Sequence, residues 1–249
     1  MPQIVIETQN LTKQYGAQKA VDNVTFNVYE GEIFGLLGPN GAGKTTILLM
    51  LLGLTEPSSG KVRVLGVDPI RDSIKVKGMI GYMPENVGFY NDMNAIQSLR
   101  FIGELNGIPR AVLEERISEA LKTVGLLEDA KKKIGAYSRG MRQKLAIAEL
   151  LIKEPKLAFL DEPTLGLDPD ATSKMIELID TLRKERNITI ILCSHYLEMV
   201  QKLCDRVGIM IKGKMVAQGK IDDLAKEKFG IGESEYTLEE IYMRYFLEA

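Results

Sequence analysis

The sequence predicts an α/β fold in which a helical region interrupts a sheet-based core. Short runs rich in apolar and β-branched residues alternate along the chain with segments of helical periodicity. One such run, 33–37, leads directly into a glycine-rich turn and then into a helical pattern. From about residue 86 to residue 153 the pattern is helical throughout. This stretch indicates an insertion between the strands that precede it and those that follow.

The composition argues against several classes of protein. The chain has 249 residues, with 32 Lys and Arg against 34 Asp and Glu, so it lacks the basic footprint of a nucleic-acid-binding protein. Hydrophobic residues make up 45% and charged residues 27%, as in folded domains and unlike disordered chains. No apolar run approaches the roughly 18 residues that span a bilayer. The N-terminus shows neither a signal peptide nor a myristoylation signal, and Cys193 and Cys204 are too few for a disulfide scaffold. We therefore expect a cytoplasmic protein.

The segment before the insertion predicts five strands and one helix. The strands are expected at 4–8, 24–29, 33–37, 61–65 and 79–83. The helix that follows the glycine-rich turn should run from about Lys44 to Leu52.

The insertion itself reads as several helices. Gly107-Ile108-Pro109 separates two of them. The second has one apolar face, formed by Leu113, Ile117, Leu121 and Val124. The lysine run 131–133 is expected to lie on a solvated surface.

Sheet-forming segments return after the insertion. Strands are expected at 157–160 and 188–192, and a hairpin from 207–211 and 214–217. Between these strands, Asp168 and Pro169 predict the N-cap and first residue of a helix. Its buried face should consist of Met175, Ile176, Ile179 and Leu182. From Lys220 the tail is charged and helical.

A glycine-rich motif predicts a phosphate-binding loop. The pattern G-x-x-x-x-G-K-[ST] is matched between a strand and a helix by Gly38, Pro39, Asn40, Gly41, Ala42, Gly43, Lys44 and Thr45. The glycines let backbone N–H groups surround phosphate oxygens, and the helix N-terminus adds partial positive charge. Lys44 should contact the β- and γ-phosphates, Thr45 should hold Mg²⁺, and Thr46 should lie on the α-phosphate side. The motif indicates a nucleoside triphosphate but not the reaction.

Two acids at the end of a strand favour hydrolysis. Asp161 and Glu162 follow the apolar run 157–160, and Pro163 comes next. In a P-loop protein such an Asp holds Mg²⁺, usually through water, and the neighbouring Glu can act as general base toward the attacking water. Because consecutive strand residues point to opposite faces, the strand must end here if both acids are to serve one site.

Five further motifs resemble those of ABC-type ATPases. Tyr137-Ser138-Arg139-Gly140-Met141-Arg142-Gln143 resembles the Leu-Ser-Gly-Gly-Gln signature. Asp168 resembles the D-loop aspartate, and His195, after an apolar strand, resembles the switch histidine. Glu85 stands where most members have the Q-loop glutamine, and Tyr15 fits the aromatic that stacks on adenine. The resemblance covers about residues 3 to 220.

The resemblance implies a fold and a mechanism. It implies a P-loop NTPase with a RecA-like core, an antiparallel β subdomain and an inserted helical subdomain. The ABC ATPase domain is then 1–220, with its core in 1–85 and 154–220, the helical subdomain in 86–153, and a short helical tail in 221–249. Two such domains sandwich two ATP molecules, each between the P-loop of one chain and the signature of the other, as a homodimer or as a heterodimer with a paralogous ATPase. A separate membrane permease binds the helical subdomain and holds the protein at the inner face of the cell membrane.

Within the family, the resemblance also implies site residues. Lys44, Glu162 and His195 would be catalytic, with His195 contacting the γ-phosphate. Ser138 and Gly140 would bind the partner's nucleotide, together with Asp168.

The signature departs from its common form. Tyr137, Arg139 and Met141 replace Leu, Gly and Gln, and these changes resemble the subgroup that serves ABC-2-type exporters, including drug and sodium exporters. Glu85 brings a charge that can bind Mg²⁺ or its waters, beside Thr45 and Asp161. For Arg139 two environments are open: contact with the partner's γ-phosphate, or a solvent-facing position on the signature loop.

Two other functions remain open at this point. One is a soluble ABC ATPase of translation or DNA maintenance, although such proteins usually carry two ATPase domains or a long coiled coil. The other is a non-hydrolysing nucleotide sensor, against which Glu162 and His195 speak.

Overall fold

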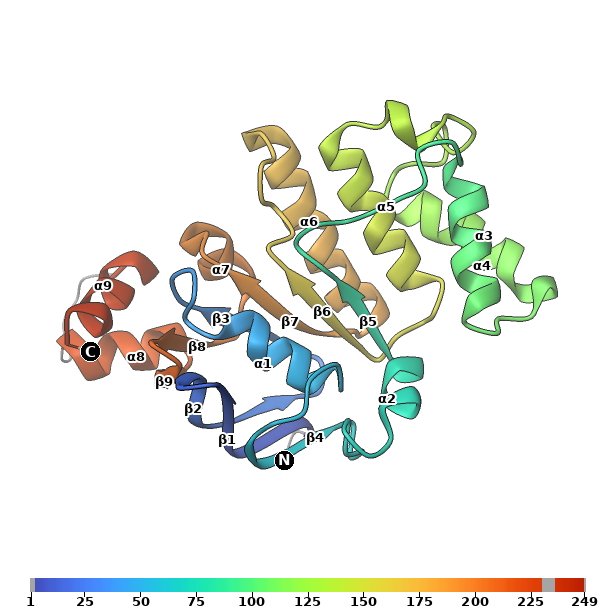
Figure 1. Cartoon of the computed structure of the whole chain (residues 1–249). Helices are drawn as coiled ribbons and strands as arrows, with labels where there is room; N and C mark the ends of the chain where they lie inside the picture. Colours follow the sequence, from blue (N-terminus) through green and yellow to red (C-terminus); the bar gives the residue numbers. More distant parts are fainter. Residues whose placement is uncertain (1–2, 230–235, 249) are drawn as a thin grey trace. The chain divides into compact units, whose positions relative to one another are not determined.

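The computed structural model describes residues 3–229 and 236–248, which fall into two compact units. The first unit comprises Met1–Lys77 and Ile188–Ala249, and the second comprises Gly78–Asn187. Figure 1 labels their helices and strands. The second unit contains the predicted helical insertion together with two strands and a further helix.

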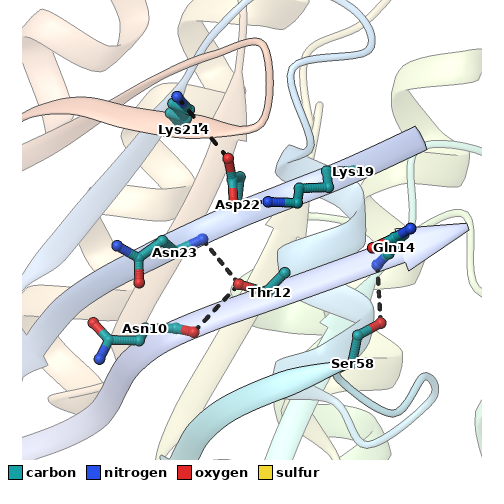
Figure 2. Close-up of polar contacts among 8 residues, drawn as sticks. All are labelled: Asn10, Thr12, Gln14, Lys19, Asp22, Asn23, Ser58 and Lys214. Atoms are coloured by element: carbon teal, nitrogen blue, oxygen red, sulfur yellow. Dashed lines mark hydrogen bonds and ion pairs between the residues drawn. The ribbon is translucent and has the colours of Figure 1, made fainter. Parts of the chain in front are cut away.

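The first unit contains an antiparallel sheet with the strand order β2-β1-β4. It is formed by β1 (Ile4–Tyr15), β2 (Gln18–Tyr29) and β4 (Ser59–Val64). β1 and β2 are longer than the sequence predicts, because their polar ends continue the antiparallel pairing as far as Tyr15 and Gln18. The N–H of Asn23 donates to Oγ1 of Thr12 at 3.0 Å, across a ladder with several register shifts (Figure 2).

The same unit contains parallel strands around β3 (Ile33–Leu37), which is buried at all five positions. β3 pairs in parallel with β7 (Thr189–Ser194) and with β8 (Arg206–Ile211), and β9 (Lys214–Gly219) is antiparallel to β8. A strand with neighbours on both sides and buried faces is expected to be continuously apolar, as the sequence of β3 is. The antiparallel pairing of β8 with β9 confirms the predicted hairpin at 207–217.

Helices complete this unit. α1 (Lys44–Leu51) starts directly after the loop that follows β3 and contacts β2 and β4 (Figure 1). α7 (Leu197–Leu203) contacts β3 and β7. α8 (Ile221–Phe229) contacts β9, and α9 (Leu238–Glu248) packs on α7 and α8.

The second unit begins with a parallel strand pair. β5 (Ile80–Met83) pairs with β6 (Leu157–Asp161), and every residue of β6 is buried. α5 (Arg139–Leu151) covers β5 closely: a Cβ at Gly81 would collide with the side chain of Leu150. Only glycine therefore fits at this position of β5.

The remaining helices of this unit pack on α5 or follow β6. α3 (Ala95–Leu105) and α4 (Arg110–Thr123) contact each other and α5, as the predicted insertion requires (Figure 1). A short 3₁₀ helix spans Ile134–Ala136. α6 (Pro169–Arg186) starts at the predicted N-cap Asp168, whose side chain accepts a hydrogen bond from the N–H of Ala171 at 2.8 Å.

The structure corrects two expectations about helices. On α6, Ile176 is only half-buried, and Leu178 joins Met175, Ile179 and Leu182 on the buried face instead. α2 (Ser73–Met79), at the boundary between the units, lies where no helix was predicted, and its last residue, Met79, was expected to begin a strand. The predicted apolar face of α4 is confirmed, because Leu113, Ile117 and Leu121 are all buried.

Candidate functional site

The glycine-rich loop 38–43 is shaped by close backbone contacts. Gly38, Gly41 and Gly43 have φ values of 155°, 80° and 102°. A Cβ at Gly38 would collide with the carbonyl oxygen of Met210, and one at Gly43 with that of Ala20. Glycine is therefore required at both places, for its conformation and for its lack of a side chain.

Gly213, in the turn between β8 and β9, is hydrogen-bonded to this loop. Its N–H donates to the carbonyl oxygen of Ala42 at 3.1 Å, and its own carbonyl accepts from the N–H of Asp22 at 2.8 Å. Asp22 also lies near the ammonium groups of Lys19 at 3.0 Å and Lys214 at 3.9 Å (Figure 2). The loop is thus tied to β2 and to the β8–β9 turn.

The N-terminus of α1 suits an anion. Its N-cap is Gly43, which supplies no side-chain cap, and no acidic residue lies in the first turn. The first N–H groups of a helix have no partner within the helix, and they carry partial positive charge. Lys44 adds a full charge here: it is 7% exposed, and its Nζ donates to the carbonyl oxygens of Gly38 at 2.6 Å and Pro39 at 3.2 Å.

Tyr15 ends β1 with an exposed ring. Its relative exposure is 50%, and the ammonium of Lys13 lies 4.9 Å from the ring centre. The neighbouring backbone is fixed, since the N–H of Gln14 donates to Oγ of Ser58 at 3.0 Å (Figure 2). A ring held this way offers a flat surface to an aromatic base.

In the second unit, two buried acids stand where β6 ends. Asp161 is the last residue of the strand and 3% exposed, and Glu162 is 7% exposed. Glu162 has φ +50°, in the left-handed region that residues other than glycine and asparagine rarely adopt. The strand therefore ends between the two acids, and the strict alternation of strand side chains no longer applies to Glu162.

Two helix N-termini share a hollow of about 190 Å³ in this unit. Ser138 caps α5, accepting a hydrogen bond from the N–H of Met141 at 3.2 Å, and α5 has no acid in its first turn. Asp168 caps α6. The hollow is lined by both caps, by Gly140, by Lys144 and by Lys174, which pairs with Asp170 of the same lining at 2.6 Å. The N-terminus of α5 and the ammonium of Lys144 suit an anion, whereas Asp168 and Asp170 oppose one.

Family membership follows from comparison with known proteins. Residues 21–165, more than half of the chain, match the family model described as ABC transporter. The chain belongs to the ABC transporter family. It is an ATP-binding subunit, and its activity is ATP hydrolysis coupled to transport.

Named ABC transporter proteins are similar over most of this chain. It is 43% identical over 222 residues to the bacitracin transport ATP-binding protein BcrA of Bacillus licheniformis, covering 89% of this chain and 72% of that protein. Identity to the linearmycin resistance ATP-binding protein LnrL of Bacillus subtilis strain 168 is 38% over 226 residues, 91% of this chain and 72% of LnrL. The dimeric post-hydrolysis structure of the ATP-binding cassette MJ0796, bound to ADP and Pi, has a TM-score of 0.76 at 25% identity and covers 86% of this chain and 98% of that one. The predicted ABC ATPase fold is thereby confirmed.

Three more ABC motif residues can be placed. Glu85 lies in the exposed segment after β5, and His195 is exposed directly after β7. Tyr137, which replaces the common leucine of the signature, is buried, and its hydroxyl donates to the carbonyl of Asp129 at 2.8 Å. Tyr137 therefore keeps the packing role of a leucine and adds one hydrogen bond.

Sequence reasoning missed several residues that shape this ABC site. Gly213 signals only a turn, and nothing local reveals its contact with Ala42. No task was predicted for Gln143 or for Gly166. Gln143 is 3% exposed, and its Nε2 donates to the carbonyl of Leu165 at 3.3 Å, so it ties α5 to the loop before α6.

In the part of the chain that the structure describes, no helix is both long and apolar enough to cross a bilayer.

Proposed function

We propose that the chain is the ATP-hydrolysing subunit of an exporter, working as a dimer around two ATP and driving separate membrane subunits. The observation that carries the proposal is the buried Lys44 ammonium inside a loop fixed by Gly38 and Gly43. A loop so constrained presents a cation and backbone N–H groups to triphosphate oxygens without first rearranging. The exporter role is supported by the named relatives, of which LnrL is a resistance protein.

Each predicted site residue then has a task in this chain. Lys44 and the first turn of α1 hold the β- and γ-phosphates, Thr46 lies beside the α-phosphate, and the Tyr15 ring supports the base. Glu162 accepts a proton from the attacking water, because a buried carboxylate at a strand end is placed for general-base work. His195 contacts the γ-phosphate.

The residues proposed as Mg²⁺ ligands carry the oxygen donors that this ion prefers. Asp161 offers a buried carboxylate, Thr45 a hydroxyl at the start of α1, and Glu85 an exposed carboxylate after β5. Mg²⁺ prefers oxygen ligands and retains waters, so few protein ligands suffice. When bound, it would neutralise charge on the phosphates.

Ser138, Gly140 and Asp168 are proposed to contact the nucleotide of a partner chain. The hollow between the α5 and α6 N-termini supports this, since the N-terminus of α5 and the ammonium of Lys144 line it. The dimeric state of MJ0796 supports the arrangement by similarity.

Glu162→Gln tests the proposal. The amide keeps the size of the side chain but loses the base, so we expect ATP turnover to fall roughly 10² to 10⁴-fold while ATP binding stays intact. The variant should elute from a sizing column as a dimer with ATP and Mg²⁺, and as a monomer with ADP. Near wild-type turnover would remove Glu162 as base, and a monomer under all conditions would refute the ATP-sandwich dimer.

A further inference from the structure

The guanidinium of Arg139 lies flat against Gly166. A Cβ built on Gly166 would stand 2.6 Å from Nη1, 2.7 Å from Cζ and 3.0 Å from Nε of Arg139. Three atoms of one planar group at nearly equal distances mean that its face, not its edge, covers the glycine. Gly166 has φ +69°, so its conformation favours glycine, and an added methyl group would have to displace the guanidinium. Arg139 is an exposed residue, but one face of its guanidinium lies against Gly166. It is therefore neither a fully solvated side chain nor a core one.

A second side chain of α5 holds the same loop. Gln143 lies one helical turn after Arg139 on the same face, and its Nε2 donates to the carbonyl of Leu165. Arg139 and Gln143 therefore contact neighbouring residues of the segment 163–168. The cap of α5 is Ser138, directly before Arg139, so this segment is attached to the first turns of the signature helix.

The segment 163–168 leads back to Glu162 through two turns. The N–H of Leu165 donates to the carbonyl of Glu162, and that of Leu167 donates to the carbonyl of Thr164, both at 3.1 Å. Glu162 itself is held in the left-handed region. A backbone in such a conformation persists only where its surroundings impose it, and these turns are part of those surroundings.

We propose that Arg139 is a positioning residue: its planar contact with Gly166 holds the segment 163–168 and thereby keeps Glu162 in its working conformation. The inference rests on the proposed role of Glu162 as general base. It assigns Arg139 a task within its own chain, whereas a contact with the partner's γ-phosphate would use its charge.

Arg139→Gln and Arg139→Lys separate the two tasks. Gln keeps a planar end without charge, and Lys keeps the charge without the plane. If planar contact matters, Arg139→Gln should retain kcat within about threefold, while Arg139→Lys and Arg139→Ala lose roughly tenfold in kcat with KM unchanged. The opposite order, with Lys active and Gln impaired, would assign the charge to phosphate and overturn the proposal. Arg116→Ala on α4, which breaks an ion pair with Glu154, is the matched control and should keep wild-type kcat.

Dimerisation gives a second readout. In the Glu162→Gln background, Arg139→Ala should leave the ATP-dependent dimer on a sizing column intact, because positioning of a base is not needed to bind ATP. Loss of that dimer would point to a phosphate contact and against our proposal. If Glu162→Gln alone has no effect on turnover, the proposed function fails. If it does and Arg139→Ala keeps full kcat, only this inference fails.

Gly166→Ala completes a double-mutant cycle. The added methyl displaces the guanidinium, so its effect on kcat should be smaller in the Arg139→Ala background than in the wild type. Additive effects would show that the two residues do not act through each other. The wild type, the two single variants and the double variant must have the same melting curve by circular dichroism, so that a change in kcat does not reflect unfolding.

Discussion

The Lys44 side chain lies where water has little access. It is 7% exposed and donates to two carbonyl oxygens of the loop it closes. The fold therefore positions the ammonium group before any phosphate arrives. Removing the side chain eliminates both the hydrogen bonds to the loop carbonyls and the proposed contact with phosphate.

Lys44→Ala is expected to fail at nucleotide binding. A hydrogen bond to a charged group contributes roughly 1.5–3 kcal/mol, so the Kd for ATP should rise on the order of 10- to 100-fold. Titration with a fluorescent ATP analogue measures this. Lys61→Ala, at an exposed position on β4, is the control and should bind as the wild type does. Equal affinity of the Lys44→Ala protein would contradict the assignment of the loop.

At the scale of single residues, the sequence predicts motifs better than it predicts contacts. The loop 38–45 is local, so its residues and their order indicate phosphate binding by themselves. The contact of Arg139 with Gly166 joins residues far apart in the chain, and no spacing rule reveals it. The left-handed conformation of Glu162 is equally hidden, because only glycine or asparagine would signal it in sequence.

At the scale of elements, α3 and α5 are joined by a hydrogen bond to a half-buried acid. Oγ of Ser98 on α3 donates to Oε1 of Glu149 on α5 at 3.2 Å. Burial raises the pKa of Glu149 from 4.5 to about 7, and the hydrogen bond from Ser98 opposes this rise. The folded chain therefore holds this proton more tightly than the unfolded chain does. Between pH 4.5 and pH 7 stability must fall as pH rises, because the native state binds more protons.

Glu149→Gln should remove this pH dependence. The amide stays neutral and can still accept from Ser98, so the variant should gain on the wild type as pH rises from 5 to 8, by roughly 3 kcal/mol in unfolding free energy. Urea denaturation at several pH values measures the difference. Ser98→Ala keeps the carboxyl but loses the hydrogen bond that opposes the rise in its pKa, so it should keep the pH dependence and carry it to higher pH. Parallel curves for wild type and Glu149→Gln would show that Glu149 titrates normally.

Most elements are predictable from the sequence, and the exceptions have physical causes. The segments 33–37, 157–160 and the hairpin at 207–217 are apolar and local in pattern, and the structure confirms them. β1 and β2 extend beyond the expected runs because their polar ends pair with each other as far as Tyr15 and Gln18. Single-sequence periodicity does not register such cross-strand bonds.

At the scale of the molecule, the proposed membrane partner needs a surface. The segment after Pro84 offers one: Tyr90 is 59% exposed and stacks edge-on against Phe101, which is 38% exposed, at 5.9 Å between ring centres. Leu105, at the end of α3, is 68% exposed. Four further apolar residues of this segment are half-buried, namely Val87, Phe89, Met93 and Ile96. Aromatic and Met residues at such a surface are typical of protein interfaces.

Replacing Phe89 and Tyr90 with Ser should release the protein from its permease. Co-expressed with the membrane subunit, the wild type should pellet with membranes and survive a high-salt wash, whereas the double variant should stay in the supernatant with ATP binding intact. Ile74→Ser, at an apolar position of α2 that is 86% exposed, is the control and should pellet. A double variant that still pellets would exclude this site, and a wild type that never pellets would exclude the exporter role.

The bracing of the phosphate loop has a consequence for how the protein is made. The loop at 38–43 is in contact with Ala20 on one side and with Met210 and Gly213 on the other. A ribosome delivers these segments in order, so the loop leaves the exit tunnel long before the β8–β9 turn exists. Until that turn arrives, the nascent chain contains every residue of the motif but lacks the neighbours that shape it. The ability to take up ATP should therefore appear late in synthesis, and chains released early should not compete for nucleotide.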